Sequence, residues 1–128
     1  MPEIVSDPFP DMAALDTLWR SAWGGPVAPG YAKVLERSLA HVGAYEAGVL
    51  VGFVNVAWDG GVHGFVLDTC VHRDFQRKGI ATALVARAAE LARARGAEWL
   101  HVDFEPHLEG FYRGCGFRES AAGVMRLG

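Results

Sequence analysis

Residues 71–84 contain a short basic loop whose residue types suit the binding of a phosphate group. The loop follows a hydrophobic run typical of a strand and precedes a pattern typical of a helix. The first N–H groups of a helix lack intrahelical partners and carry partial positive charge, so they bind anions well. Gly79 lets an anion approach the backbone closely, because it has no Cβ. Gln76 can donate an amide hydrogen bond, and Arg77 and Lys78 add positive charge.

The spacing Gln76-x-x-Gly79-x-Ala81 therefore predicts a phosphate cradle. It is not a Walker A loop, because no Gly-Lys-Ser/Thr sequence is present, and its glycine spacing differs from that of the dinucleotide-binding fingerprint. A nucleotide hydrolase of the P-loop type is disfavoured for the same reason. Taken alone, the loop has a second interpretation, which is an ordinary strand-to-helix turn with a basic surface.

Residues 71–81 resemble the acetyl-CoA-binding motif of the GCN5-related N-acetyltransferase (GNAT) family, which has Gln/Arg-x-x-Gly-x-Gly/Ala at this place. Residues 111–117, Phe-Tyr-Arg-Gly-Cys-Gly-Phe, resemble the Phe-Tyr-x-x-x-Gly-Phe segment of the same family. The two matches stand in the family's order, with a helix and a strand between them. The resemblance covers about residues 49–117. Many members have Asn six residues before the Phe of the second match, where this chain has Glu105.

The resemblance implies an enzyme that uses acetyl-CoA as co-substrate, and it assigns residues to the cofactor. The loop backbone would bind the pyrophosphate through Arg77, Lys78, Gly79, Ile80, Ala81 and Thr82, next to Gln76. Backbone groups of Cys70 and Val71 would pair with the pantetheine arm like an added strand and polarise the thioester carbonyl. Tyr112 would contact the same arm.

Acetyl transfer from a thioester to an amine requires a base for the amine and an acid for the departing thiolate. A phenol with a pKa near 10 can donate to the thiolate, and the resemblance gives this role to Tyr112. Asp68, Asp103 and His101 are the candidates for the base, because burial can make a carboxylate a useful proton acceptor. Each of these residues also has a purely structural interpretation. A covalent acyl-enzyme on Cys70 is the weaker idea, because a free Cys is usually a small buried hydrophobe.

The surrounding sequence predicts one α+β (α/β) domain over residues 1–128, with a central mixed, mostly antiparallel sheet and about four helices. We expect helices over 11–23, 31–39 and 80–95 and a fourth from Pro106, and strands near 4–5 and over 41–46, 49–58, 63–71 and 99–104. The segments 67–71 and 99–104 flank a helix and should form the parallel pair. The resemblance implies that they splay apart and admit the thioester arm. The tail, 117–128, is expected to add one or two strands around a turn at 121–123.

A loop rich in Gly and Pro, residues 24–30, joins the first two expected helices. In the resembling family the equivalent region often shapes the acceptor site. Trp23 and Tyr31 flank the loop and are candidates for contact with the substrate. Ordinary packing is the favoured interpretation of both residues, because apolar residues at helical spacing usually belong to the core.

Composition excludes several classes of function. The net charge of −3 argues against a nucleic-acid binder, no apolar run is long enough to span a membrane, and no signal peptide opens the sequence. A cytoplasmic location is therefore expected. The two cysteines are expected to be free thiols, and the five histidines show no metal-ligand spacing, so no metal is expected. The short tail leaves few residues to close the acceptor side, which suggests a homodimer.

The sequence thus predicts an acetyl-CoA-dependent N-acetyltransferase that transfers the acetyl group directly, in a ternary complex, to a primary amine of an unidentified small molecule, peptide or protein. The alternative is an acyl-CoA-binding sensor or assembly module without turnover, because a fold does not fix a function.

Overall fold

A computed structural model describes the whole chain, residues 1–128, and its centre is a five-stranded sheet in the order β1-β2-β3-β4-β5. The strands are β1 (Glu3–Ser6), β2 (Ala40–Glu46), β3 (Val49–Trp58), β4 (His63–Val71) and β5 (Trp99–Val102). The first four pair antiparallel with their neighbours, and β5 pairs parallel with β4. This is the expected mixed α+β sheet with one parallel strand pair.

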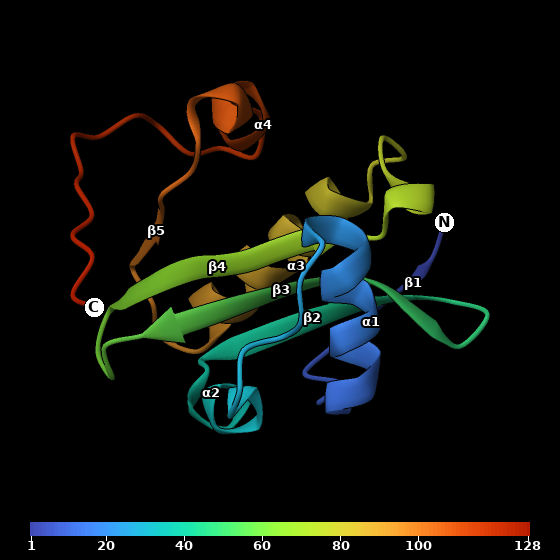
Figure 1. The fold of residues 1–128 in the computed structure, drawn as a ribbon. Helices are drawn as coiled ribbons and strands as arrows, with labels where there is room; N and C mark the ends of the chain where they lie inside the picture. The colour runs from blue at the N-terminus through green and yellow to red at the C-terminus, as the bar shows by residue number, and fades with distance from the viewer.

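Helices cover both faces of the sheet (Figure 1). Helix α3 (Ile80–Ala94) lies on one face, whereas α1 (Met12–Trp23) and α2 (Tyr31–Arg37) lie on the other. The fourth helix, α4 (Glu109–Gly114), follows a 3-10 turn (Pro106–Leu108) and lies beyond the end of β5. A second 3-10 turn (Arg73–Phe75) comes between β4 and α3. None of these helices is long and apolar enough to cross a membrane.

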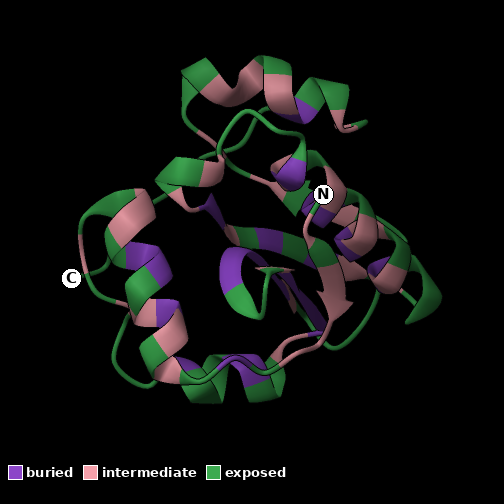
Figure 2. Ribbon diagram, turned by 90° about the vertical axis from the view of Figure 1, so that its right-hand side faces the viewer, coloured by how far each residue is buried: buried purple, intermediate pink, exposed green.

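Each face of the sheet has its own hydrophobic core. Helix α3 buries Ile80, Leu84, Ala88 and Ala92 against the valines of β2, β3 and β4, as its helical spacing predicts. On the other face, α1 and α2 pack an aromatic and aliphatic cluster against Phe53 of β3. Figure 2 shows the buried residues on the sheet-facing sides of the helices and on the central strands. The sheet is thereby held rigidly between the two layers, and the site is built at one of its ends.

Several expected boundaries are wrong by a few residues, for physical reasons. Helix α2 ends at Arg37, and the N–H of Leu39 already donates to the carbonyl of Val56 in β3. Strand β5 ends at Val102 instead of Phe104, because it separates from β4 there. Pro106 begins a 3-10 turn, and α4 proper starts at Glu109.

The strands expected in the tail are also wrong. No residue after Cys115 belongs to a helix or a strand, and the tail pairs with no strand of the sheet. Val124, Met125 and Leu127 are all more than four-fifths exposed. Only Phe117 packs against the core.

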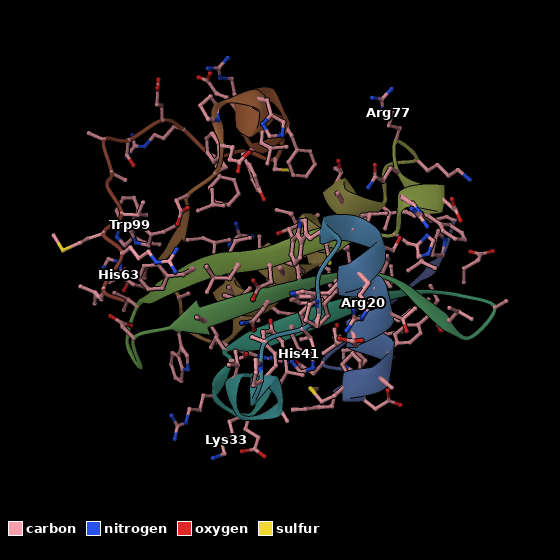
Figure 3. All side chains as sticks on the ribbon, viewed as in Figure 1. Arg20, Lys33, His41, His63, Arg77 and Trp99 are labelled. Atoms are coloured by element: carbon pink, nitrogen blue, oxygen red, sulfur yellow. The ribbon has the colours of Figure 1, made fainter.

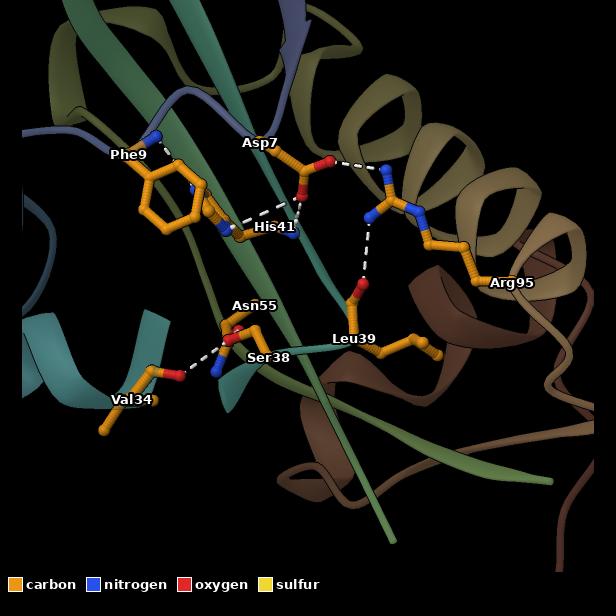
Figure 4. Close-up of polar contacts among 8 residues, drawn as sticks. All are labelled: Asp7, Phe9, Val34, Ser38, Leu39, His41, Asn55 and Arg95. Atoms are coloured by element: carbon orange, nitrogen blue, oxygen red, sulfur yellow. Dashed lines mark hydrogen bonds and ion pairs between the residues drawn. The ribbon is translucent and has the colours of Figure 1, made fainter. Parts of the chain in front are cut away.

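A buried histidine fastens the segment after β1 to the body of the protein (Figure 4). His41 is 1% exposed, and its Nε2 accepts a hydrogen bond from the N–H of Phe9 at 2.9 Å. The Asp7 carboxylate accepts from the N–H of His41 at 3.0 Å and from the Arg95 guanidinium at 2.5 Å. Arg95 also donates to the carbonyl of Leu39 at 2.9 Å. The network therefore ties the N-terminal segment, β2 and the end of α3 together.

This network predicts that the protein loses stability in acid. Burial lowers the pKa of His41 below its usual 6.5, although the nearby Asp7 charge opposes the shift. Burial alone would raise the pKa of Asp7, but the Arg95 hydrogen bond and charge lower it below 3.8. Both groups bind protons more readily when the chain is unfolded. The free energy of unfolding should therefore fall as the pH drops through 6.5, and again below 3.8.

The His41 contribution can be isolated by measuring the melting temperature between about pH 7 and about pH 5. His41→Gln should be less stable at neutral pH, because it repacks a buried site. Its amide oxygen can still accept from the Phe9 N–H, and it does not titrate. We expect the wild-type melting temperature to fall across this range and the variant's to change less. Equal slopes for the two proteins would show that His41 is not the titrating group.

Candidate active site

Strand β4 contains a β-bulge close to the point where it separates from β5. The register between β3 and β4 shifts between Phe53 and Asn55, so that two residues of β4, Asp68 and Thr69, lie opposite one residue of β3. Asp68 adopts a left-handed conformation with φ +59°, which is rare for a residue other than glycine. The parallel pairing of β4 with β5 stops just before it, at Val66 and Val102. The last part of β4 therefore has no neighbour on the β5 side.

A groove of about 870 Å³ occupies the gap between the two diverging strands. One wall is the end of β4 with the loop that leads into α3, and the other is the end of β5 with α4. In Figure 1, β5 leaves β4 in the direction of α4, and the loop before α3 lies beyond the end of β4. The groove is lined by Asp68, Asp103, Tyr112 and every residue predicted to bind the cofactor except Lys78.

The start of α3 forms the basic end of the groove. Gly79 is the N-cap, with φ +81°, and Arg77 has φ +62°. A Cβ added to Gly79 would meet only the methyl group of Met1, at 3.9 Å, so the space in front of its backbone is open. The unpaired N–H groups of the first helical turn begin at this point. The Arg77 side chain extends away from the protein, at the opposite end from His63 and Trp99 (Figure 3).

Two side chains of this loop are engaged in contacts that stabilise the loop, so they are not free to bind a ligand. The Gln76 amide donates to the carbonyl of Val71 at 3.1 Å and so closes the loop onto the end of β4. The Lys78 Nζ lies 5.4 Å from the centre of the Phe75 ring, in a cation–π contact. The anion-binding capacity of the loop therefore rests on its backbone N–H groups and on Arg77.

Backbone groups along β4 alternate between its two edges. Cys70 pairs with β3, and the N–H of His72 donates to the carbonyl of Val51 at 2.8 Å. Such bonds recur at every second residue of an antiparallel pair, so the N–H and C=O of Val71 point toward the gap. The carbonyl is taken by Gln76. Of the two residues expected to pair with a pantetheine arm, Val71 presents its backbone to the groove, whereas the Cys70 backbone faces β3.

Tyr112 closes the far wall of the groove. It is 6% exposed and stacks on Phe104 at 5.0 Å between ring centres, with Phe117 edge-on at 5.8 Å. Burial raises the pKa of Tyr112, and the nearby Thr69 hydroxyl opposes the shift only in part. The phenol is therefore protonated at neutral pH. Thr69 lines the groove, and its Oγ1 is buried close to this phenol without a hydrogen bond of good geometry in the protein.

Two carboxylates, Asp68 and Asp103, also line the groove. Asp68 accepts a hydrogen bond from the Tyr31 hydroxyl at 2.8 Å and forms no ion pair. Asp103 follows the last residue of β5, across the gap. Burial, with the charge of Asp68, raises the pKa of Tyr31, so that its hydroxyl keeps its proton and donates. Trp23, about half exposed, lines the groove as well.

Two other candidates have surroundings that do not suit the roles considered for them. His101 does not line the groove, because its Nε2 lies 2.9 Å from Nδ1 of His63 and its ring stacks on Phe65. Its candidacy as the base is therefore wrong. Burial and the charge of Asp68 raise the pKa of Cys70, which is a free thiol, so it is not a thiolate nucleophile. Cys115 is free as well. Glu105, at the position where the resemblance led us to expect Asn, does line the groove.

The sequence does not predict a role for Thr69 or the pairing of Tyr31 with Asp68. Thr69 lies in the strand between Asp68 and Cys70, which are both predicted site residues, and this position is the one indication in the sequence that it belongs to the site. The Tyr31 contact joins residues 37 positions apart, and no local pattern encodes it.

The fold is a mixed α+β sheet with a groove between two diverging parallel strands. A model of the acetyltransferase (GNAT) family matches residues 4–117 of this chain. The chain therefore belongs to the GNAT family.

Similar proteins support this assignment. An uncharacterized N-acetyltransferase of Pyropia yezoensis, ycf52, is 28% identical over 78 residues, which is 61% of this chain and 45% of that protein. The chain thus spans less than half the length of this relative. A probable acetyltransferase of unknown function from methicillin-resistant Staphylococcus aureus shares 19% identity and a TM-score of 0.85, covering 100% of this chain and 99% of the other.

Two more solved structures have the same fold. A GNAT family protein from Streptococcus pneumoniae gives 22% identity and a TM-score of 0.82, over 100% of this chain and 98% of the other. An aminoglycoside N-acetyltransferase solved in complex with CoA gives 18% identity and a TM-score of 0.78, over 100% of this chain and 95% of that chain.

Proposed function

We propose that this protein is an acetyl-CoA-dependent N-acetyltransferase that transfers the acetyl group directly to a primary amine. One observation carries the proposal: a single groove joins an open, glycine-capped helix start to a buried phenol and two carboxylates. The residues fit the cofactor, because the space in front of the Gly79 backbone is open and a Cβ there would narrow it. The CoA-bound neighbour and the family membership agree with this fit.

The residues that would hold the cofactor divide between the two walls. The N–H groups of residues 77–82 would bind the diphosphate, assisted by the Arg77 side chain, because the helix start concentrates partial positive charge there. The Val71 N–H would pair with the pantetheine arm and polarise the thioester carbonyl. When bound, acetyl-CoA supplies the acyl group as a thioester.

The protein's own groups would move the protons. Asp68 would accept a proton from the acceptor ammonium, directly or through water, and Asp103 across the gap is the second candidate. The protonated phenol of Tyr112 would donate to the sulfur of the departing thiol. Both groups line one groove, so an amine can be bound between them.

A non-catalytic acyl-CoA-binding module is the second candidate. It would use the same loop and the same groove, and it would leave Asp68 and Tyr112 without a chemical role.

Acetyl transfer distinguishes the two functions. The purified protein is incubated with acetyl-CoA and a panel of primary amines that includes a diamine, an amino sugar and a lysine-containing peptide. Free thiol and the acetylated product are then measured. We expect equimolar thiol and N-acetylated product with at least one amine. Stabilisation of the protein by coenzyme A without turnover would favour the binding module, because a ligand of the native state raises the melting temperature. The absence of both turnover and stabilisation by coenzyme A would contradict both candidate functions.

A further inference from the structure

The Tyr31 hydroxyl makes the only hydrogen bond that the protein offers to the Asp68 carboxylate. The bond from Tyr31 Oη to Asp68 Oδ2 measures 2.8 Å and joins the start of α2 to the bulge of β4. The other carboxylate oxygen of Asp68 has no partner in the protein, and Asp68 lines the groove. One side of the carboxylate is therefore fixed, and the other is available to a bound group.

Tyr31 is itself held rigidly. It is 5% exposed, and its ring packs edge-on against Trp19 and Phe53, with ring centres 5.3 Å and 6.2 Å away. Such packing restricts the ring to one rotamer, so the hydroxyl has a fixed direction. Its protonated state is secure, because burial and the neighbouring negative charge raise the pKa of Tyr31. A rigid, permanently protonated donor is suited to orienting a carboxylate.

The backbone conformation of Asp68 explains why its side chain needs this hydrogen bond. A residue other than glycine at φ +59° is strained and persists only where its surroundings hold it. The bulge turns Asp68 out of the regular alternation of β4, so the ladder hydrogen bonds alone do not direct its side chain. Asp68 thus needs an external support, and Tyr31 is the only side chain that supplies one.

We infer that Tyr31 is a positioning residue: its hydroxyl holds one oxygen of Asp68 so that the other oxygen faces the ammonium group of the acceptor amine. The inference rests on the proposed function and assigns the acceptor end of its groove. It also connects the loop before α2 to the site, because Tyr31 is the first residue of that helix. The acceptor that fits is one whose amine arrives protonated, since the group that receives it is a carboxylate.

The test compares Tyr31→Phe, Asp68→Asn and the double variant, with Tyr45→Phe as the matched control. Tyr45 lies on β2, does not line the groove, and makes no hydroxyl hydrogen bond with another residue. With the best amine of the panel, Tyr31→Phe should lower kcat/KM for the amine by roughly 10- to 100-fold, which corresponds to one hydrogen bond to a charged group. The KM for acetyl-CoA and the stabilisation by coenzyme A should not change. In the Asp68→Asn background the same substitution should have little further effect.

An independent readout needs no turnover. In protein labelled at tyrosine Cζ, the Tyr31 carbon signal should shift in Asp68→Asn, whereas the Tyr45 signal should not. Equal kcat/KM in Tyr31→Phe and wild type overturns the inference alone, and so does a loss that is just as large in the Asp68→Asn background. If the wild-type protein acetylates no amine of the panel, the proposed function fails and the inference fails with it.

Discussion

Tyr112→Phe should lower kcat for acetyl transfer by about 100-fold or more, the usual contribution of a positioned proton donor. The substitution removes only the hydroxyl. The ring that stacks on Phe104 and packs against Phe117 is kept, so the wall of the groove should remain in place. Binding of coenzyme A should therefore change little. The measurement is steady-state kinetics at saturating acetyl-CoA, with calorimetric titration of coenzyme A into the same variant.

The physical reason is the protonation state of the phenol. Burial raises the pKa of Tyr112, so the group carries its proton at neutral pH and can give it to a departing thiolate. Tyr45→Phe again serves as the control, because it removes a tyrosine hydroxyl outside the groove. If Tyr112→Phe keeps the wild-type kcat, the phenol is a packing residue and another group protonates the thiol.

The second large effect is expected at Gly79. Gly79→Ala should weaken coenzyme A binding by about tenfold or more, equivalent to the loss of about one charge-assisted hydrogen bond. Two consequences of the added methyl group act together. It occupies the open space before the start of α3, where the anion would approach, and it disfavours the left-handed φ of +81° that directs the first N–H groups. Titration calorimetry with coenzyme A measures the change.

Gly48 supplies the matched control for backbone strain. It has φ +80° in the turn between β2 and β3, and a Cβ added there would meet nothing within 4 Å. Gly48→Ala and Gly79→Ala should both lose roughly 1–2 kcal/mol of stability from the left-handed conformation. Only Gly79→Ala should lose affinity for coenzyme A. An equal loss of coenzyme A affinity in the two variants would mean that general destabilisation, and not a change in the phosphate cradle, is responsible.

The parts of the site that the sequence predicts are those with a local signal. The β4–loop–α3 segment combines an apolar run, a basic glycine-bearing loop and a helical repeat, and each of these depends on neighbours within a few residues. The strand–helix–strand order then requires β4 and β5 to be parallel. The groove between them, with Tyr112 on its far wall, follows from this topology together with the second motif.

The parts that could not be predicted depend on tertiary contacts. Nothing in the sequence of β4 marks a bulge at Asp68, because the residue that adopts the left-handed conformation is not a glycine. A Gln or Lys side chain in this loop can either face a bound anion or stabilise the loop. Gln76 donates to Val71 and Lys78 contacts Phe75, so both stabilise the loop. These orientations depend on packing, and residue type alone does not determine them. The tail is a further example, because its apolar residues have a pattern typical of a strand but no neighbouring strand pairs with them.

Calorimetric titration of the wild-type protein with coenzyme A tests the central claim most directly. We expect one binding site per chain, with an affinity that falls as salt is added, because a diphosphate on backbone N–H groups and Arg77 is an electrostatic contact. No heat of binding at millimolar coenzyme A would contradict the assignment of the groove between β4 and β5 as a cofactor site. Binding that is unchanged in Gly79→Ala would show that the ligand lies elsewhere.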